Sequence, residues 1–149
     1  KRTVMGPWYS MLNSPEGSGM WTINKKIYND WGEEGILEMK KYMSRLLSLT
    51  RSKNISLTVA VHPWPIQVWH EDLNSLQVQI WRDWCRANNV KFVNYFPKLI
   101  RKGLDDNEKR LVLDKYFLPG DIHFNEQGNQ LIAEEFLKRY PKENQLSLN

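Results

Sequence analysis

An aspartate and a histidine two positions apart are the residues of this chain best suited to proton transfer. They are Asp121 and His123, which follow Gly120 and precede the last amphipathic segment. In an extended segment, residues two apart project to the same side, so the Asp121 carboxylate can reach the nearer ring nitrogen of His123. That contact would leave the other nitrogen free to accept a proton, as a general base for a serine hydroxyl must. The alternative is a turn aspartate beside a half-buried polar histidine.

Three further residues are candidates for contacting a substrate: His62, Trp64 and Asn125. His62 ends a predicted strand, and α/β sheets bind ligands at the carboxyl ends of their strands, although a packed or capping histidine is the alternative. Trp64 could stack on a carbohydrate, whereas most of the seven tryptophans are expected to pack the core. Asn125 is also a suitable cap for the final helix.

No metal site and no organic cofactor is predicted. The spacing of His62, His70 and His123 matches no zinc pattern. The single cysteine, Cys85, lies on the core side of a predicted helix and excludes an internal disulfide framework. One cysteine does not decide the compartment.

The elements that must position these residues alternate between helix and strand. From Glu33 to Leu49, apolar residues recur at steps of three and four, which predicts a helix with one buried face. Residues 55–61 predict a strand covered on both sides, which must end before Pro63. The other predicted elements are a helix over 73–84, a strand over 90–95, a short helix over 108–116, and a helix that follows Asn125, includes Tyr140 and stops at Pro141.

This order predicts an α/β fold with parallel strands. The first part of the chain, residues 1–32, contains prolines, glycines and aromatic residues, and predicts a loop with aromatic anchors. Two strands are only part of a parallel sheet, which usually has about four to six. Either Thr3–Met5 adds an edge strand or the rest of the sheet lies in sequence outside this chain, and we favour the second.

The run from Asp121 to Asn125, with Gly128 and the amphipathic helix after it, resembles the final block of the SGNH (GDSL-type) hydrolase superfamily. That block supplies the aspartate and histidine of a Ser-His-Asp triad. The commoner family pattern is Asp-x-x-His, and the shorter spacing here is more like the branch that includes alginate-type O-acetyltransferases. The stretch Val61–Pro65 also resembles a strand-to-loop junction on the active-site side of that branch.

The family carries its serine in a Gly-Asp-Ser turn after the first strand, and this sequence contains no such turn. Ser10, Ser14 and Ser18 follow no predicted strand, so none is expected to be the nucleophile. The resemblance implies a three-layer, flavodoxin-like sandwich of which this chain is the C-terminal half. Residues 1–149 would then be one partial domain, with helix–strand repeats over 33–140 and a tail over 141–149.

The function implied by the resemblance is a serine esterase or O-acyltransferase acting on an ester such as an acylated carbohydrate. His123 would be the general base and then the general acid, with Asp121 as its orienting carboxylate. The expected partners are the ester substrate and the missing N-terminal half, which would carry the serine. The alternative is an inactive α/β module that binds a glycan or a protein, and an upstream Gly-Asp-Ser turn would distinguish the two.

Composition supports an ordinary globular chain. Of the 149 residues, 41% are hydrophobic and 26% are charged, and no apolar run approaches the roughly 20 residues that a membrane-spanning helix needs. The net charge is only +4 and the basic residues are scattered, which does not favour nucleic-acid binding.

Overall fold

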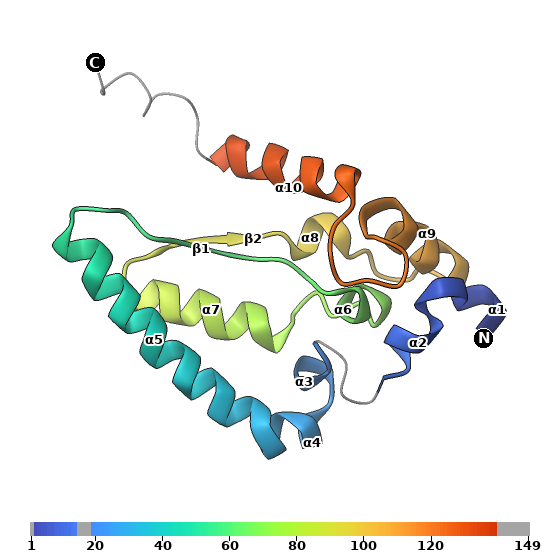
Figure 1. Ribbon diagram of the computed structural model, residues 1–149, viewed down its shortest axis with the longest axis horizontal. Coiled ribbons are helices and arrows are strands. Elements are labelled where there is room, and N and C mark those ends of the chain that lie inside the picture. The colour runs from blue at the N-terminus through green and yellow to red at the C-terminus, as the bar shows by residue number, and fades with distance from the viewer. Residues whose placement is uncertain (1, 15–18, 140–149) are drawn as a thin grey trace.

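The computed structural model describes residues 2–14 and 19–139 (Figure 1). The described elements, in chain order, are α1 (Arg2–Met5), η1 (Gly6–Trp8), α2 (Tyr9–Leu12), α3 (Met20–Ile23), α4 (Lys25–Ile27), η2 (Tyr28–Gly32), α5 (Glu33–Ser52), β1 (Thr58–Val61), α6 (Pro65–Trp69), α7 (Leu76–Ala87), β2 (Lys91–Asn94), α8 (Phe96–Leu99), α9 (Asp106–Tyr116) and α10 (Glu126–Arg139). The predicted end of the last helix at Tyr140 and Pro141, and the predicted tail, lie outside the described residues.

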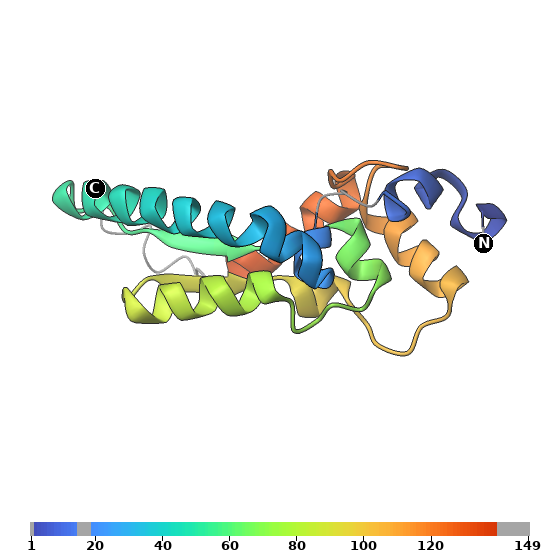
Figure 2. The same ribbon diagram turned by 90° about the horizontal axis from the view of Figure 1, so that it is seen from below.

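The strands and long helices agree with the predicted α/β class. β1 and β2 pair in parallel, and α7 packs against both strands. The two views together show α5 and α7 on one side of the sheet and α10 on the other (Figures 1 and 2). Within the described part of the chain the sheet has two strands, and most of the structure is helical.

One face of this small sheet is covered unevenly. Ala60 of β1 and Val93 of β2 are register partners, so their side chains lie on the same face. Val93 is fully buried, whereas Ala60 is exposed. The protein therefore covers this face over β2 and leaves it open over β1. The prediction of a strand over 55–61 covered on both sides is wrong in these respects, since β1 begins at Thr58 and Ala60 is exposed.

The first 32 residues differ from the predicted loop. Their described part forms short helices and turns, and Thr3–Met5 lies in helix α1 and not in an edge strand. Trp8 anchors this segment, because its side chain is fully buried and its Nε1 donates to Asp114 Oδ1 at 2.7 Å. Helices of three to five residues carry no periodic apolar pattern, so burial of the aromatic side chains holds them in place instead.

The core is rich in aromatic residues, as the sequence predicts. Most tryptophans are buried in it, and the buried cysteine also lies on its helix as predicted. Burial raises the pKa of the Cys85 thiol, which disfavours the reactive thiolate. The exception at the surface is Trp31, which is 49% exposed. No described helix has the length and apolar character needed to cross a bilayer.

Candidate active site

A tight turn between α9 and α10 presents the aspartate and the histidine. Phe117 and Phe124 form an antiparallel bridge across the base of this turn. Inside it, the Leu118 N–H donates to the His123 carbonyl at 2.9 Å, and the Asp121 N–H donates to the Leu118 carbonyl at 2.9 Å. These bonds fix the backbone on both sides of the candidate pair.

Glycine is required at the tip of the turn. Gly120 has a φ of +74°, and a Cβ there would come within 3.0 Å of the Pro7 carbonyl oxygen. Other residues rarely adopt this backbone conformation. The turn therefore rests against the N-terminal segment, which Trp8 ties to α9.

Asp121 and His123 are in direct contact. The distance from His123 Nδ1 to Asp121 Oδ1 is 2.6 Å, and the same oxygen accepts the His123 backbone N–H at 3.1 Å. The His123 side chain is 73% exposed and that of Asp121 is 47% exposed. The imidazole is thus held by its neighbour on one edge and open to solvent on the other.

The charge of Asp121 decides the tautomer of the ring. The hydrogen bond from the His123 side chain, together with that from its backbone N–H, lowers the pKa of Asp121 below the ordinary value of 3.8. The carboxylate is therefore ionised at neutral pH and accepts a proton from Nδ1. The lone pair of a neutral His123 ring is then on Nε2, the nitrogen that faces away from Asp121.

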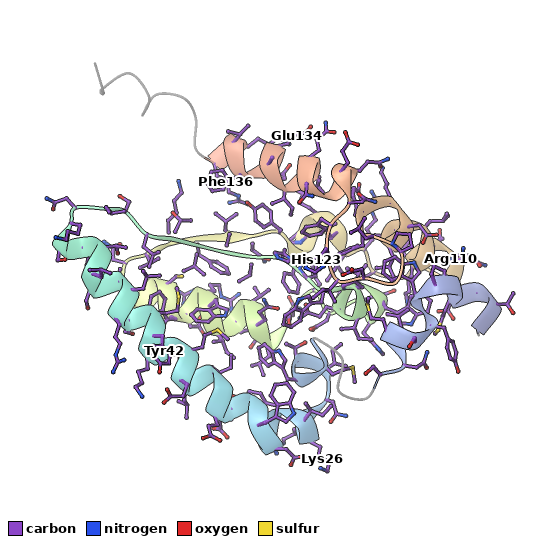
Figure 3. The ribbon with its side chains drawn as sticks, viewed as in Figure 1. Lys26, Tyr42, Arg110, His123, Glu134 and Phe136 are labelled. Carbon is purple, nitrogen blue, oxygen red and sulfur yellow. The ribbon has the colours of Figure 1, made fainter. Side chains whose placement is uncertain are left out.

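A depression of about 450 Å³ brings His123 together with two of the other predicted residues. It is lined by His62, Trp64, Ile122, His123, Phe124 and Asn129. Figure 3 shows His123 on the turn before α10, close to the point where the chain leaves β1. His62 and Trp64 follow β1 directly, so the carboxyl end of that strand and the turn form one site, as α/β sheets commonly do.

His62 packs against the turn. Its ring centroid lies 4.9 Å from that of Phe124, at an interplanar angle of 54°. Desolvation lowers the pKa of His62, and a hydrogen bond with the Pro63 backbone opposes this effect in part. Although much of its surface is exposed, the imidazole is neutral at neutral pH. A neutral imidazole has one nitrogen that donates and one that accepts.

Two residues, Gly19 and Gln67, position Trp64. Gly19 lies against it so closely that a Cβ there would come within 2.7 Å of Trp64 Cε3. The fully buried Gln67 accepts the Trp64 backbone N–H at 2.8 Å. Its amide nitrogen reaches Thr22 Oγ1 at 3.1 Å and Ser75 Oγ at 3.0 Å, which ties α6 to α3 and to the start of α7.

Asn125 has a different position from the one predicted for a substrate ligand. Its Oδ1 accepts the Gly128 N–H at 3.0 Å, so it caps α10 as the sequence indicates. Its Nδ2 donates to the carbonyl oxygens of Lys115 at 3.0 Å and Phe117 at 3.2 Å, at the end of α9. Both ends of the amide are thus used within the protein, and Asn125 is not among the residues that line the depression. Its role here is to hold α9 and α10 together behind the turn.

Asn129 was not singled out by the sequence. It lines the depression from the first turn of α10 and is exposed. The available signal was its place one turn after the Asn125 cap, on the side of the helix that faces the turn.

The described residues contain neither a cluster of metal ligands nor a serine that is hydrogen-bonded to His123. In residues 2–14 and 19–139, no three histidine, cysteine, aspartate or glutamate side chains lie so that they could hold a metal ion. No serine hydroxyl in those same ranges forms a hydrogen bond with the His123 ring. Ser18 lies outside the described residues, and the exposed Ser10 lies in α2.

Comparison with known proteins gives no relative. No family model, curated protein or solved structure matches this chain. What the chain does must therefore be inferred from the arrangement of its own residues.

Proposed function

We propose that this chain carries the acid–base half of a serine esterase or O-acyltransferase site of the SGNH type. The observation that carries the proposal is the 2.6 Å contact between Asp121 and an otherwise open His123 ring, at the edge of a depression. A carboxylate that fixes one imidazole nitrogen, with the other nitrogen free, is the arrangement that activates a hydroxyl nucleophile.

The proposed reaction uses His123 twice. As a serine oxygen attacks the ester carbonyl, His123 Nε2 accepts the serine proton, and the Asp121 carboxylate stabilises the resulting imidazolium. The imidazolium then gives that proton to the departing alkoxide, and an acyl-enzyme remains. Water or an acceptor hydroxyl attacks the acyl-enzyme, gives its proton to Nε2, and releases the acid or the new ester as the proton returns to the serine.

The serine is proposed to come from sequence outside these 149 residues. Ala60 is exposed in the middle of β1, on a face that is covered over β2. A strand added parallel to β1 would end beside His62, at the depression, and the helix that connects it to the sheet would cover this face. Such strands would complete the larger flavodoxin-like sheet that the resemblance implies.

The outer surface of α5 supports the same proposal. Four large apolar residues at steps of three and four form a stripe along it: Met39, Tyr42, Leu46 and Leu49. All four are exposed. Figure 3 shows Tyr42 midway along this helix. An exposed apolar stripe of this kind is a surface on which the missing half of an α/β domain would pack.

The test is ester hydrolysis by the full-length product of the gene that encodes this chain. With p-nitrophenyl acetate as the substrate, His123→Gln should lower kcat by about a thousandfold or more, because the groups of a triad act as a unit. Thermal unfolding of the variant should stay close to that of the parent, because the His123 side chain is mostly exposed. An active His123→Gln variant would refute the proposal.

A second candidate is a binding module without catalysis. The absence of a serine bonded to His123 within residues 2–14 and 19–139 favours it. In that case the depression would bind a ligand, and the full-length product would show no hydrolysis that depends on His123.

A further inference from the structure

The depression beside His123 has a lining without formal charges. The described residues that line it include two histidines, an asparagine and three apolar side chains, and none is a lysine, arginine, aspartate or glutamate. Its volume of about 450 Å³ falls within the range of small-molecule sites. A carboxylate or phosphate bound here would have no cation to pair with, so the lining favours an uncharged ligand.

The apolar part of the lining is aromatic. Trp64 and Phe124 lie on it; Gly19 packs against the Trp64 ring, and Gln67 accepts the Trp64 backbone N–H. A fixed indole ring loses little entropy when a flat ligand stacks on it. The C–H face of a pyranose ring is such a surface, and an aliphatic chain gains less from a rigid plane.

The polar part of the lining suits hydroxyl groups. His62 lines the depression with an exposed, neutral imidazole, which carries one nitrogen that donates and one that accepts. Asn129 adds an exposed amide: its Nδ2 donates one hydrogen to the Phe124 carbonyl at 3.5 Å and has a second to donate, and its Oδ1 can accept. Groups of both kinds around an aromatic plane match the alternating hydroxyls of a neutral sugar.

We propose that the depression binds an uncharged pyranose unit, stacked on Trp64 and hydrogen-bonded by His62 and Asn129. This inference rests on the proposed function, because it takes the sugar to be part of the ester or of the acceptor. That sugar unit would lie next to His123. It narrows the substrate class to neutral glycans and excludes uronates and phosphorylated sugars.

The experiment is a titration of the 149-residue chain with cellotetraose, followed by NMR and by calorimetry. Shifts should concentrate at the Trp64 indole and the His62 ring, with a Kd in the range of about 1 mM, as expected for a shallow site. Trp64→Ala and His62→Phe should each weaken binding by about tenfold. Trp31→Ala is the matched control, because Trp31 is exposed but does not line the depression, and it should leave binding unchanged.

The charged comparison is tetragalacturonate, which should bind at least about tenfold more weakly than cellotetraose. The proposal is overturned if cellotetraose does not bind, if the shifts lie elsewhere, or if the charged oligomer binds as tightly. Asp121→Asn separates the two proposals, because it should remove ester hydrolysis by the full-length product while cellotetraose binding persists. Binding without hydrolysis would reject the esterase alone, and hydrolysis without binding would reject the sugar site alone.

Discussion

Gly128 lies so close to the end of α9 that a Cβ added to it would come within 2.1 Å of the Tyr116 carbonyl oxygen. The same atom would come within 2.8 Å of the Phe124 ring. Since Phe124 ends the turn and lines the depression, this approach between α9 and α10 sets the position of the site. The close approach of the two helices thus explains why position 128 is a glycine.

Replacing this glycine should be costly. We expect Gly128→Ala to lower the free energy of unfolding by about 2–4 kcal/mol, because a backbone carbonyl cannot move aside as a flexible side chain can. Urea denaturation measures the change. Gly35→Ala is the control: Gly35 lies in α5 with nothing near its added Cβ, so it should stabilise by up to about 1 kcal/mol. Equal free energies of unfolding for the two variants would contradict the close approach of Gly128 to the Tyr116 carbonyl.

Asn125→Ala should destabilise the protein and leave ligand contacts intact. It removes the cap of α10 and the bonds to three carbonyl oxygens at the end of α9, with an expected loss of about 2 kcal/mol. Asn125→Ser keeps the capping oxygen and should recover about half of the loss. If Asn125→Ala unfolded like the parent but lost cellotetraose binding, the substrate role predicted from the sequence would be correct and the structural role wrong.

The Asp121 carboxyl should titrate below 3.8, and NMR of its carboxyl carbon measures this directly. In His123→Gln we expect its pKa to rise toward the ordinary value, since the side-chain bond from His123 is the largest cause of the lowering. Because the pKa of Asp121 is lowered in the folded protein, the contact adds to the free energy of unfolding at pH values above 3.8. This contribution disappears as the pH falls through the lowered pKa. An Asp121 carboxyl that titrates identically in parent and variant would rule out the contact.

Gly19→Ala should displace Trp64. Gly19 has a φ of +92°, and its Cβ would meet Trp64 Cε3 at 2.7 Å and Ile66 Cγ2 at 2.8 Å. Gly103→Ala is a matched control, because Gly103 has a φ of +79° but open space around it. Backbone strain is common to both variants, so the free energy of unfolding of Gly19→Ala should be lower than that of Gly103→Ala by about 1–3 kcal/mol. Of the two variants, only Gly19→Ala should weaken cellotetraose binding. Equal effects would show that Gly19 does not support Trp64.

Sequence patterns predicted the parts of the fold that are periodic. The spacing of apolar residues identified α5 and α7, and the alternation identified β1. The predicted buried face of α5 is only partly correct, because Ile36 and Leu47 are buried whereas Met39 and Leu46 are exposed. The predicted contact between Asp121 and His123 is confirmed, although residues 121–123 form bends in a tight turn and not the extended segment assumed. Residues two apart need no tertiary contact to meet.

The rest depended on contacts distant in sequence. Residues 2–14 fold as short helices because Trp8 bonds Asp114, a partner more than a hundred positions away. Helix α6 was not predicted, although Pro65 stands at its first position and proline favours the first turn of a helix. The second role of Asn125 needs the carbonyls of α9, whose position no local pattern reveals.

The central claim is that His123 acts on a serine that these 149 residues do not contain. A fluorophosphonate probe, which labels only activated serines, tests it on the full-length gene product with mass spectrometry of the labelled peptide. We predict label on a serine outside residues 1–149, loss of that label in His123→Gln, and no label on the 149-residue chain alone. Label on Ser10, Ser14 or any other serine within the chain, or label that persists in His123→Gln, would contradict the claim.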